Sequence, residues 1–183
     1  MINIKDYPLF IPPEEVNSQK PREWSYTQAK IYFDWFMSIK DHRVEYLLTV
    51  FDEEFSSDNE KLLKGLGKKV FETLQIAPFS TDESSGKVIS NKGLAIAADI
   101  SLLVSKLIIK NHPRLKWRIV RTPKRDLSFH LPAIFNFPKL GHLELMGGSI
   151  VNSKAILRGE ETSDVWWRMF KYADDVLKNE DRK

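Results

Sequence analysis

The chain contains no cysteine among its 183 residues. Disulfide frameworks, cysteine-based zinc sites and every mechanism that begins with a thiol nucleophile are therefore excluded. The first 20 residues also lack the uninterrupted apolar stretch of a signal peptide, since Asp6, Glu14, Glu15 and three prolines fall there. We therefore expect a cytoplasmic protein.

Common catalytic signatures are missing as well. The sequence has no G-x-S-x-G, H-E-x-x-H or G-x-G-x-x-G motif. The stretch from Gly65 to Lys69 resembles a phosphate-binding loop, but that motif needs Ser or Thr where Lys69 stands. The four histidines include no pair at helical ligand spacing, so we expect neither a metal nor a cofactor. A non-enzymatic protein is the favoured interpretation, with an enzyme of unfamiliar type using Asp99 or His130 as the third hypothesis.

No apolar run is long enough to cross a membrane. The longest, from Gly93 to Ile109, is interrupted by Asp99 and Lys106 and falls short of the ~20 residues that a spanning helix needs. We expect a core helix there and no membrane association. Lys92, Asp99 and Lys106 share a narrow stripe of that helix, which predicts a single solvated strip. The chain's length and its 42% hydrophobic content fit one globular domain over residues 1–183.

Apolar residues spaced three and four apart predict a mainly α fold of about five helices. A small antiparallel β element is expected between the fourth and fifth helices, and α+β is the alternative class. Caps and proline stops set the expected bounds. The helices are predicted over 25–40, 41–51 and 58–74, from Asn91 to before Pro113, and from Ser163 onward.

Two segments are expected to lack helix. Residues 1–23 contain four prolines, which favour extended backbone, and apolar side chains that could pack on the body. This segment is predicted to be an extended N-terminal arm. The polar stretch over 79–87 is typical of a surface connector.

After Pro113 the hydrophobic period changes from 3.6 to 2. Leu115, Trp117 and Ile119 alternate with other residues, which predicts a half-buried strand. A turn over 122–124 and a second alternating stretch over 127–131 predict its hairpin partner. Another hairpin is expected over 142–148, where two glycines could form the turn.

The strongest feature is a run of basic residues without any acidic one. Of the 28 Lys and Arg residues, seven lie between positions 110 and 125, and the other 21 are outnumbered by 25 Asp and Glu. This run therefore carries the whole positive balance, and such segregation indicates an anionic partner. The seven are Lys110, Arg114, Lys116, Arg118, Arg121, Lys124 and Arg125.

Five of the seven form the candidate binding site, because Lys110 fits a helix C-terminus and Arg114 precedes the strand. The favoured partner is an acidic protein surface, and nucleic acid is the alternative. A structural explanation competes with both: basic residues protect an edge strand against aggregation if Trp117 points inward. The sequence does not indicate an oligomeric state. The candidate residues are Lys116, Arg118, Arg121, Lys124 and Arg125.

Overall fold

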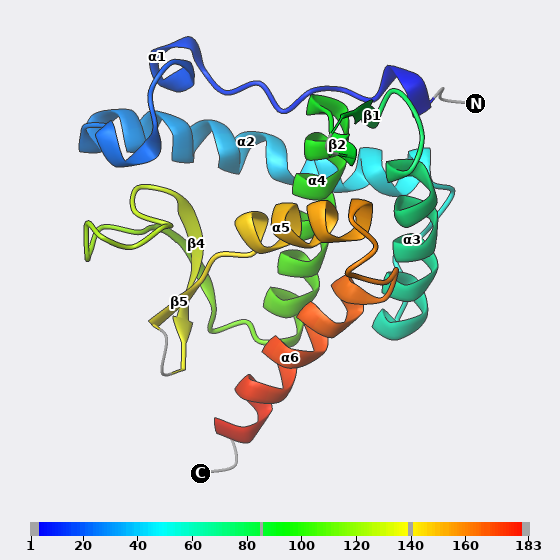
Figure 1. Cartoon of the computed structure of the whole chain (residues 1–183). Helices are drawn as coiled ribbons and strands as arrows, with labels where there is room; N and C mark the ends of the chain where they lie inside the picture. The colour runs from blue at the N-terminus through cyan, green and yellow to red at the C-terminus, as the bar shows by residue number, and fades with distance from the viewer. Residues whose placement is uncertain (1–3, 85, 139–140, 181–183) are drawn as a thin grey trace.

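The computed structural model describes residues 4–84, 86–138 and 141–180. Within these ranges the fold is mainly helical with two small antiparallel sheets, which confirms the predicted class (Figure 1). Two short 3-10 turns, Ile4–Asp6 and Pro21–Glu23, lie in the N-terminal arm. The helices are α1 (Glu14–Asn17), α2 (Tyr26–Val50), α3 (Asn59–Leu74), α4 (Asn91–Asn111), α5 (Met146–Leu157) and α6 (Val165–Glu180). The strands are β1 (Ser80–Glu83), β2 (Gly86–Ile89), β3 (Lys116–Ile119), β4 (Pro132–Phe137) and β5 (Gly141–Leu143).

Helix α4 is the centre of the core. It contacts α2, α3, α5 and α6, and most of its residues are buried (Figure 1). Ser101 and Ser105 donate their hydroxyls to carbonyls of their own helix, so burial leaves neither unsatisfied. The predicted core helix is confirmed. No helix in the described part of the chain is long and apolar enough to cross a bilayer.

Helix α2 is one continuous helix, and the predicted break at Asp41 is wrong. Its predicted start at residue 25 is confirmed by a reciprocal cap, in which Ser25 Oγ accepts from the backbone N–H of Gln28 and Gln28 Oε1 accepts from that of Ser25. Asp41 instead accepts from Lys40 and Lys106 at 2.5 and 2.9 Å. Neither proline nor glycine occurs nearby, so the backbone ladder continues through this position.

Two other predicted starts and one predicted loop can be compared with the structure. Asp58 caps α3 as expected, accepting from Lys61 N at 2.9 Å, whereas α4 is capped by Ser90 and not by Asn91. The predicted connector over 79–87 contains the hairpin of β1 and β2. The sequence did not predict these strands, because most of their side chains are exposed and polar and show no alternation of apolar residues. The hairpin is held together by backbone pairing.

The second sheet has the order β3-β4-β5, so β3 lies at an edge. The alternation predicted for β3 is confirmed, but its partner is β4, paired with Trp117 opposite Ile134, and not the stretch 127–131, which forms turns. The predicted hairpin over 142–148 is also wrong. Gly147 and Gly148 lie in the first turn of α5, where the Glu144 carboxylate accepts the backbone N–H groups of Met146 and Gly147.

The predicted solvated strip on α4 is wrong at its middle residue. Asp99 is completely buried beneath α2 and the arm, where Arg43 and the Tyr7 hydroxyl hydrogen-bond to its carboxylate. Arg43 also donates to the carbonyls of Pro8 and Leu9 at 3.0 and 3.1 Å. A buried charge is stable only when it is paired, so this cluster fastens the arm to α2 and α4 at once.

Candidate functional site: a basic strand and loop beside an aromatic cleft

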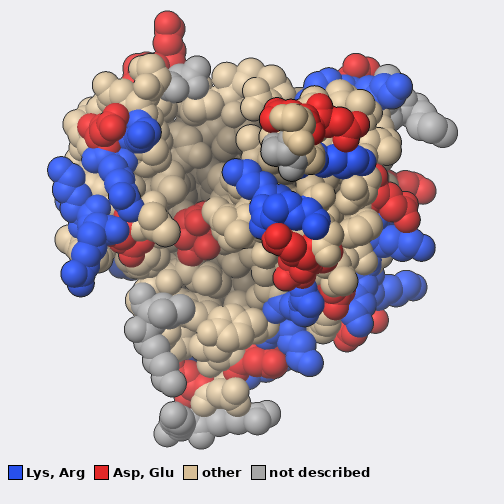
Figure 2. Space-filling model, viewed as in Figure 1, with Lys and Arg blue, Asp and Glu red and all other residues tan. Residues whose placement is uncertain are grey.

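The five candidate residues lie on one strand and the loop that follows it. Lys116 and Arg118 project from the outward face of β3, while Arg121, Lys124 and Arg125 lie in the loop between β3 and β4. All five are exposed. Figure 2 shows Lys and Arg side chains gathered at the left edge of the molecule, over the region where Figure 1 places this loop.

The other two residues of the basic run, Lys110 and Arg114, make contacts that stabilise the fold. Lys110 lies in the last turn of α4, where a cation complements the helix dipole, as predicted. Arg114 forms an ion pair with Glu180 at 3.6 Å. All seven residues are exposed, but Lys110 and Arg114 are explained by contacts within the fold, and the five candidates make up the rest of the run.

The arm and local hydrogen bonds hold the loop in place. Backbone pairing continues past β3, with Val120 N donating to Leu131 O at 3.0 Å and His130 N donating to Val120 O at 2.8 Å. Arg22 of the arm donates to the Arg125 carbonyl at 3.4 Å. The Asp126 carboxylate accepts from the backbone N–H and hydroxyl of Ser128, and these bonds lower its pKa. The cations are thus presented on a supported loop.

None of the five candidates forms an ion pair with any carboxylate in the described ranges. Basic residues elsewhere on the surface commonly do: Lys30 pairs with Asp34, and Lys64 with Glu60 at 2.6 Å. The positive charge of the strand and loop is therefore not neutralised within the described part of the molecule. This is the main electrostatic feature of the site.

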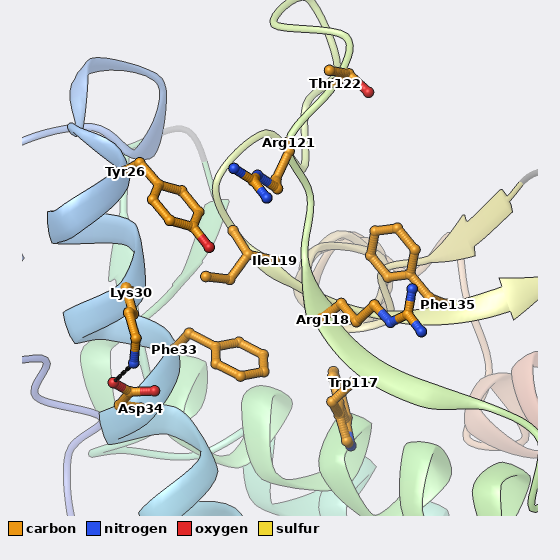
Figure 3. Close-up of a pocket in the computed structure, with 10 residues that line it drawn as sticks. All are labelled: Tyr26, Lys30, Phe33, Asp34, Trp117, Arg118, Ile119, Arg121, Thr122 and Phe135. Atoms are coloured by element: carbon orange, nitrogen blue, oxygen red, sulfur yellow. Dashed lines mark hydrogen bonds and ion pairs between the residues drawn. The ribbon is translucent and has the colours of Figure 1, made fainter.

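Trp117 is half-buried and faces inward. Its ring meets Phe36 of α2 edge-on, with ring centroids 5.1 Å apart and planes at 66°. The same side chain also lines a cleft of about 470 Å³ between α2 and the sheet (Figure 3). The inward orientation therefore places Trp117 beside a surface depression.

The cleft combines aromatic walls with cations. The α2 wall carries Tyr26, Phe33 and the Lys30–Asp34 ion pair, and the sheet wall adds Trp117, Arg118, Ile119, Arg121, Thr122 and Phe135 (Figure 3). The Arg121 guanidinium lies over the Tyr26 ring, 4.3 Å from its centroid, a cation–π arrangement that orders both side chains. Arg118 has neither an acidic nor an aromatic partner among the described residues.

The α2 wall was missed by sequence reasoning. Phe33 is next to the buried Tyr32 in the sequence, but it is only half-buried and borders the cleft. A signal was present, because Tyr26, Lys30 and Phe33 are spaced four and three apart and so define a second face of α2. Only the position of β3 makes that face a wall.

The remaining polar candidates are occupied by structural contacts. His112 is the C-cap residue of α4, and its Nε2 lies 2.8 Å from Oδ1 of Asp174 in α6. His130 is buried, stacks on Phe129 and contacts the carbonyl of Pro21. The described residues include no group of three or more His, Asp or Glu side chains able to hold a metal ion. Because the side chains of Asp99 and His130 are both buried, neither residue lies at an open surface.

Comparison of the chain with protein-family models, with curated proteins and with solved structures gives no significant match, so inferences about function rest on its own residues.

Proposed function

We propose that the protein binds an acidic surface of another protein through Lys116, Arg118, Arg121, Lys124 and Arg125. The observation that carries the proposal is that these five cations are contiguous, exposed and without ion-pair partners in the described structure. Carboxylates of a partner would gain charge-assisted hydrogen bonds, especially from the three guanidinium groups. Such complementarity also accelerates association and excludes basic partners.

Edge protection accounts for only part of this charge. Lys116 and Arg118 lie on an edge strand, where charged side chains oppose pairing with another chain. The other three candidates, Arg121, Lys124 and Arg125, lie in the loop after β3 and not on the strand itself. The three loop cations therefore need another explanation, and a partner supplies one.

A protein partner is favoured over nucleic acid by two features. Single-stranded nucleic acid is usually bound by aromatic faces on which bases stack. Here Arg121 covers the Tyr26 ring, and the other three aromatic rings that line the cleft, those of Phe33, Trp117 and Phe135, are only half-buried within it and do not stand out from the surface. The chain outside the basic run also has more acidic than basic residues, so a long polyanion would meet repulsion beyond the site.

The test is a charge reversal with a matched control. The triple variant Arg118→Glu, Arg121→Glu and Arg125→Glu should lose the partners that the wild-type protein retains in quantitative affinity purification. A control variant with Lys68, Lys154 and Lys171 each changed to Glu has the same net charge but alters exposed positions on α3, α5 and α6. It should retain the partners. Circular dichroism verifies that both variants are folded.

Two results would overturn the proposal. One is recovery of the same partners at the same yield by the site variant. The other is retention of nucleic acid by the wild-type protein in filter binding near ~50 mM salt, lost steeply as salt increases, which would assign the charge to the nucleic-acid alternative.

A further inference from the structure

We infer that the cleft between α2 and β3 receives a large apolar side chain of the partner, so that the ligand is a peptide segment in which carboxylates flank a Phe or a residue of similar size. This inference rests on the proposed function, because the same cations would hold the flanking carboxylates. It adds the substrate class: an acidic segment with an apolar anchor.

The size and lining of the cleft fit such an anchor. Its volume of about 470 Å³ lies within the range of ~300–1,000 Å³ typical of ligand sites. Phe33, Trp117, Ile119 and Phe135 are only half-buried, so apolar surface on both walls stays open to water. Burying that surface against an inserted ring would be favourable, and aromatic anchors in such depressions dominate many interfaces.

Charge fixes how the segment would lie. On the α2 wall Lys30 and Asp34 neutralise each other, whereas Arg118 and Arg121 on the sheet wall have no carboxylate partner in the described structure. Figure 3 shows the Arg121 guanidinium beside Tyr26 and Ile119, and the Arg118 guanidinium beside Phe135. Carboxylates next to the anchor would therefore face β3 and its loop, away from Asp34. Lys124 and Arg125 continue the positive surface along the loop for residues farther from the anchor.

The probes are two fluorescein-labelled acidic nonapeptides that differ only at the central residue, which is Phe in one and Ser in the other. Fluorescence polarisation measures their affinities, with an oligothymidine of ten nucleotides as a third probe. Burial of one aromatic side chain corresponds to at least ~10-fold, and this is the expected advantage of the Phe peptide over the Ser peptide. The triple Arg-to-Glu variant should bind neither peptide.

Variants of the cleft locate the anchor. Phe33→Ala should reduce the advantage of the Phe peptide to about threefold or less, because it removes the middle of the α2 wall. Tyr26→Ala is the second variant, and its 46% exposed side chain makes misfolding a minor concern. Leu127→Ala is the matched control. Leu127 is an 84% exposed apolar residue of the loop between β3 and β4, and it does not line the cleft. It should leave the advantage unchanged.

The outcomes separate this inference from the proposed function. Equal binding of the two peptides, abolished by the triple charge reversal, would overturn the apolar anchor and leave the acidic partner standing. If the Phe peptide keeps its full advantage over the Ser peptide in both Phe33→Ala and Tyr26→Ala, the apolar anchor is also overturned. Absence of binding to either peptide, or preferential binding of the oligonucleotide, would overturn both proposals together.

Discussion

Arg43 of α2 and Asp99 of α4 form a forked ion pair inside the protein, with Nε 2.6 Å from Oδ1 and Nη2 2.7 Å from Oδ2. Burial raises the pKa of the Asp99 carboxyl, while Arg43 and the Tyr7 hydroxyl act in the opposite direction. Burial and the neighbouring Asp99 carboxylate raise the pKa of the Tyr7 hydroxyl, while Arg43 acts in the opposite direction. Arm, α2 and α4 therefore meet at one satisfied polar cluster.

Removing one partner of this pair should be far more damaging than removing both. Arg43→Met leaves a buried unpaired carboxylate and should lower the free energy of unfolding by about 3–5 kcal/mol. The triple variant Arg43→Met, Asp99→Leu and Tyr7→Phe should recover most of that loss, because it leaves neither a buried charge nor the Tyr7 hydroxyl without a partner. Urea denaturation measures both. Lys30→Met serves as the control, because its exposed partner Asp34 makes that pair worth about 0–1 kcal/mol. A single variant as stable as wild type would contradict the pairing.

Two glycines of α3 should respond in opposite ways to alanine. A Cβ on Gly67 would lie 2.3 Å from the carbonyl oxygen of Ser163, so Gly67→Ala should cost roughly 1–3 kcal/mol through displacement of the segment preceding α6. A Cβ on Gly65 would meet only the Glu53 carboxylate, at 3.4 Å. Gly65→Ala should therefore be neutral or stabilise by up to about 1 kcal/mol. Thermal unfolding of the two variants tests whether Gly67 lies this close to the Ser163 carbonyl. Equal changes in the melting temperature of the two variants would refute it.

The exposed edge of β3 should become a site of self-association when its charges are removed. Lys116→Val with Arg118→Val leaves an uncharged edge strand, and sedimentation velocity should then show species that grow with concentration. Lys124→Val with Arg125→Val removes the same charge from the loop and should stay in the wild-type state. If the loop variant associated equally, net charge and not the strand edge would be responsible.

Asp174 should contribute a pH-dependent part of the stability. Burial opposes its ionisation, but hydrogen bonds from Lys178, Asn111 and His112 outweigh this and lower its pKa. Because the folded pKa lies below the unfolded value near ~3.9, the stabilisation is present above that value and is lost as pH falls through the folded pKa. Asp174→Asn should cost about 1–3 kcal/mol near neutral pH.

The measurement is the free energy of unfolding of wild type and Asp174→Asn between about pH 3 and pH 5.5. The difference between the two proteins should narrow at the acidic end of this range. A constant difference would mean that the ionised carboxylate is not the stabilising form. Asp175→Asn, one position along α6 and on its exposed side, should show no comparable cost.

Local signals in the sequence predicted the elements whose stability is local. The cap at Ser25, the cap at Asp58 and the buried stripe of α6 are confirmed, because helix caps and 3.6-residue spacing act within a few residues. The prediction of a hairpin over 142–148, where α5 begins, was wrong for a related reason. The sequence Gly147-Gly148 favours a turn by itself, and the helix start depends on the Glu144 side chain.

The burial of Asp99 and the presence of the cleft depend on contacts between distant segments, which the sequence does not reveal. Asp99 was expected to be solvated because its own helix offers a polar stripe, but Arg43, 56 positions earlier, covers it. The five cations were found by their spacing along the chain. The cleft beside them was not, because its second wall comes from α2 and no local pattern records which helix lies next to which strand.

The hydrogen bond from Arg22 to the Arg125 carbonyl joins the first 25 residues of the chain to the loop that carries the charge. Together with the hydrogen bonds from Arg43 to the carbonyls of Pro8 and Leu9, it attaches the described part of the arm to the rest of the fold at two separate places. A shortened chain that begins at α2 would therefore be a different molecule. Its basic loop would lose the hydrogen bond from Arg22, and its central ion pair would lose the Tyr7 hydroxyl and the backbone that shields it from water. Binding measured on such a fragment would describe the fragment alone.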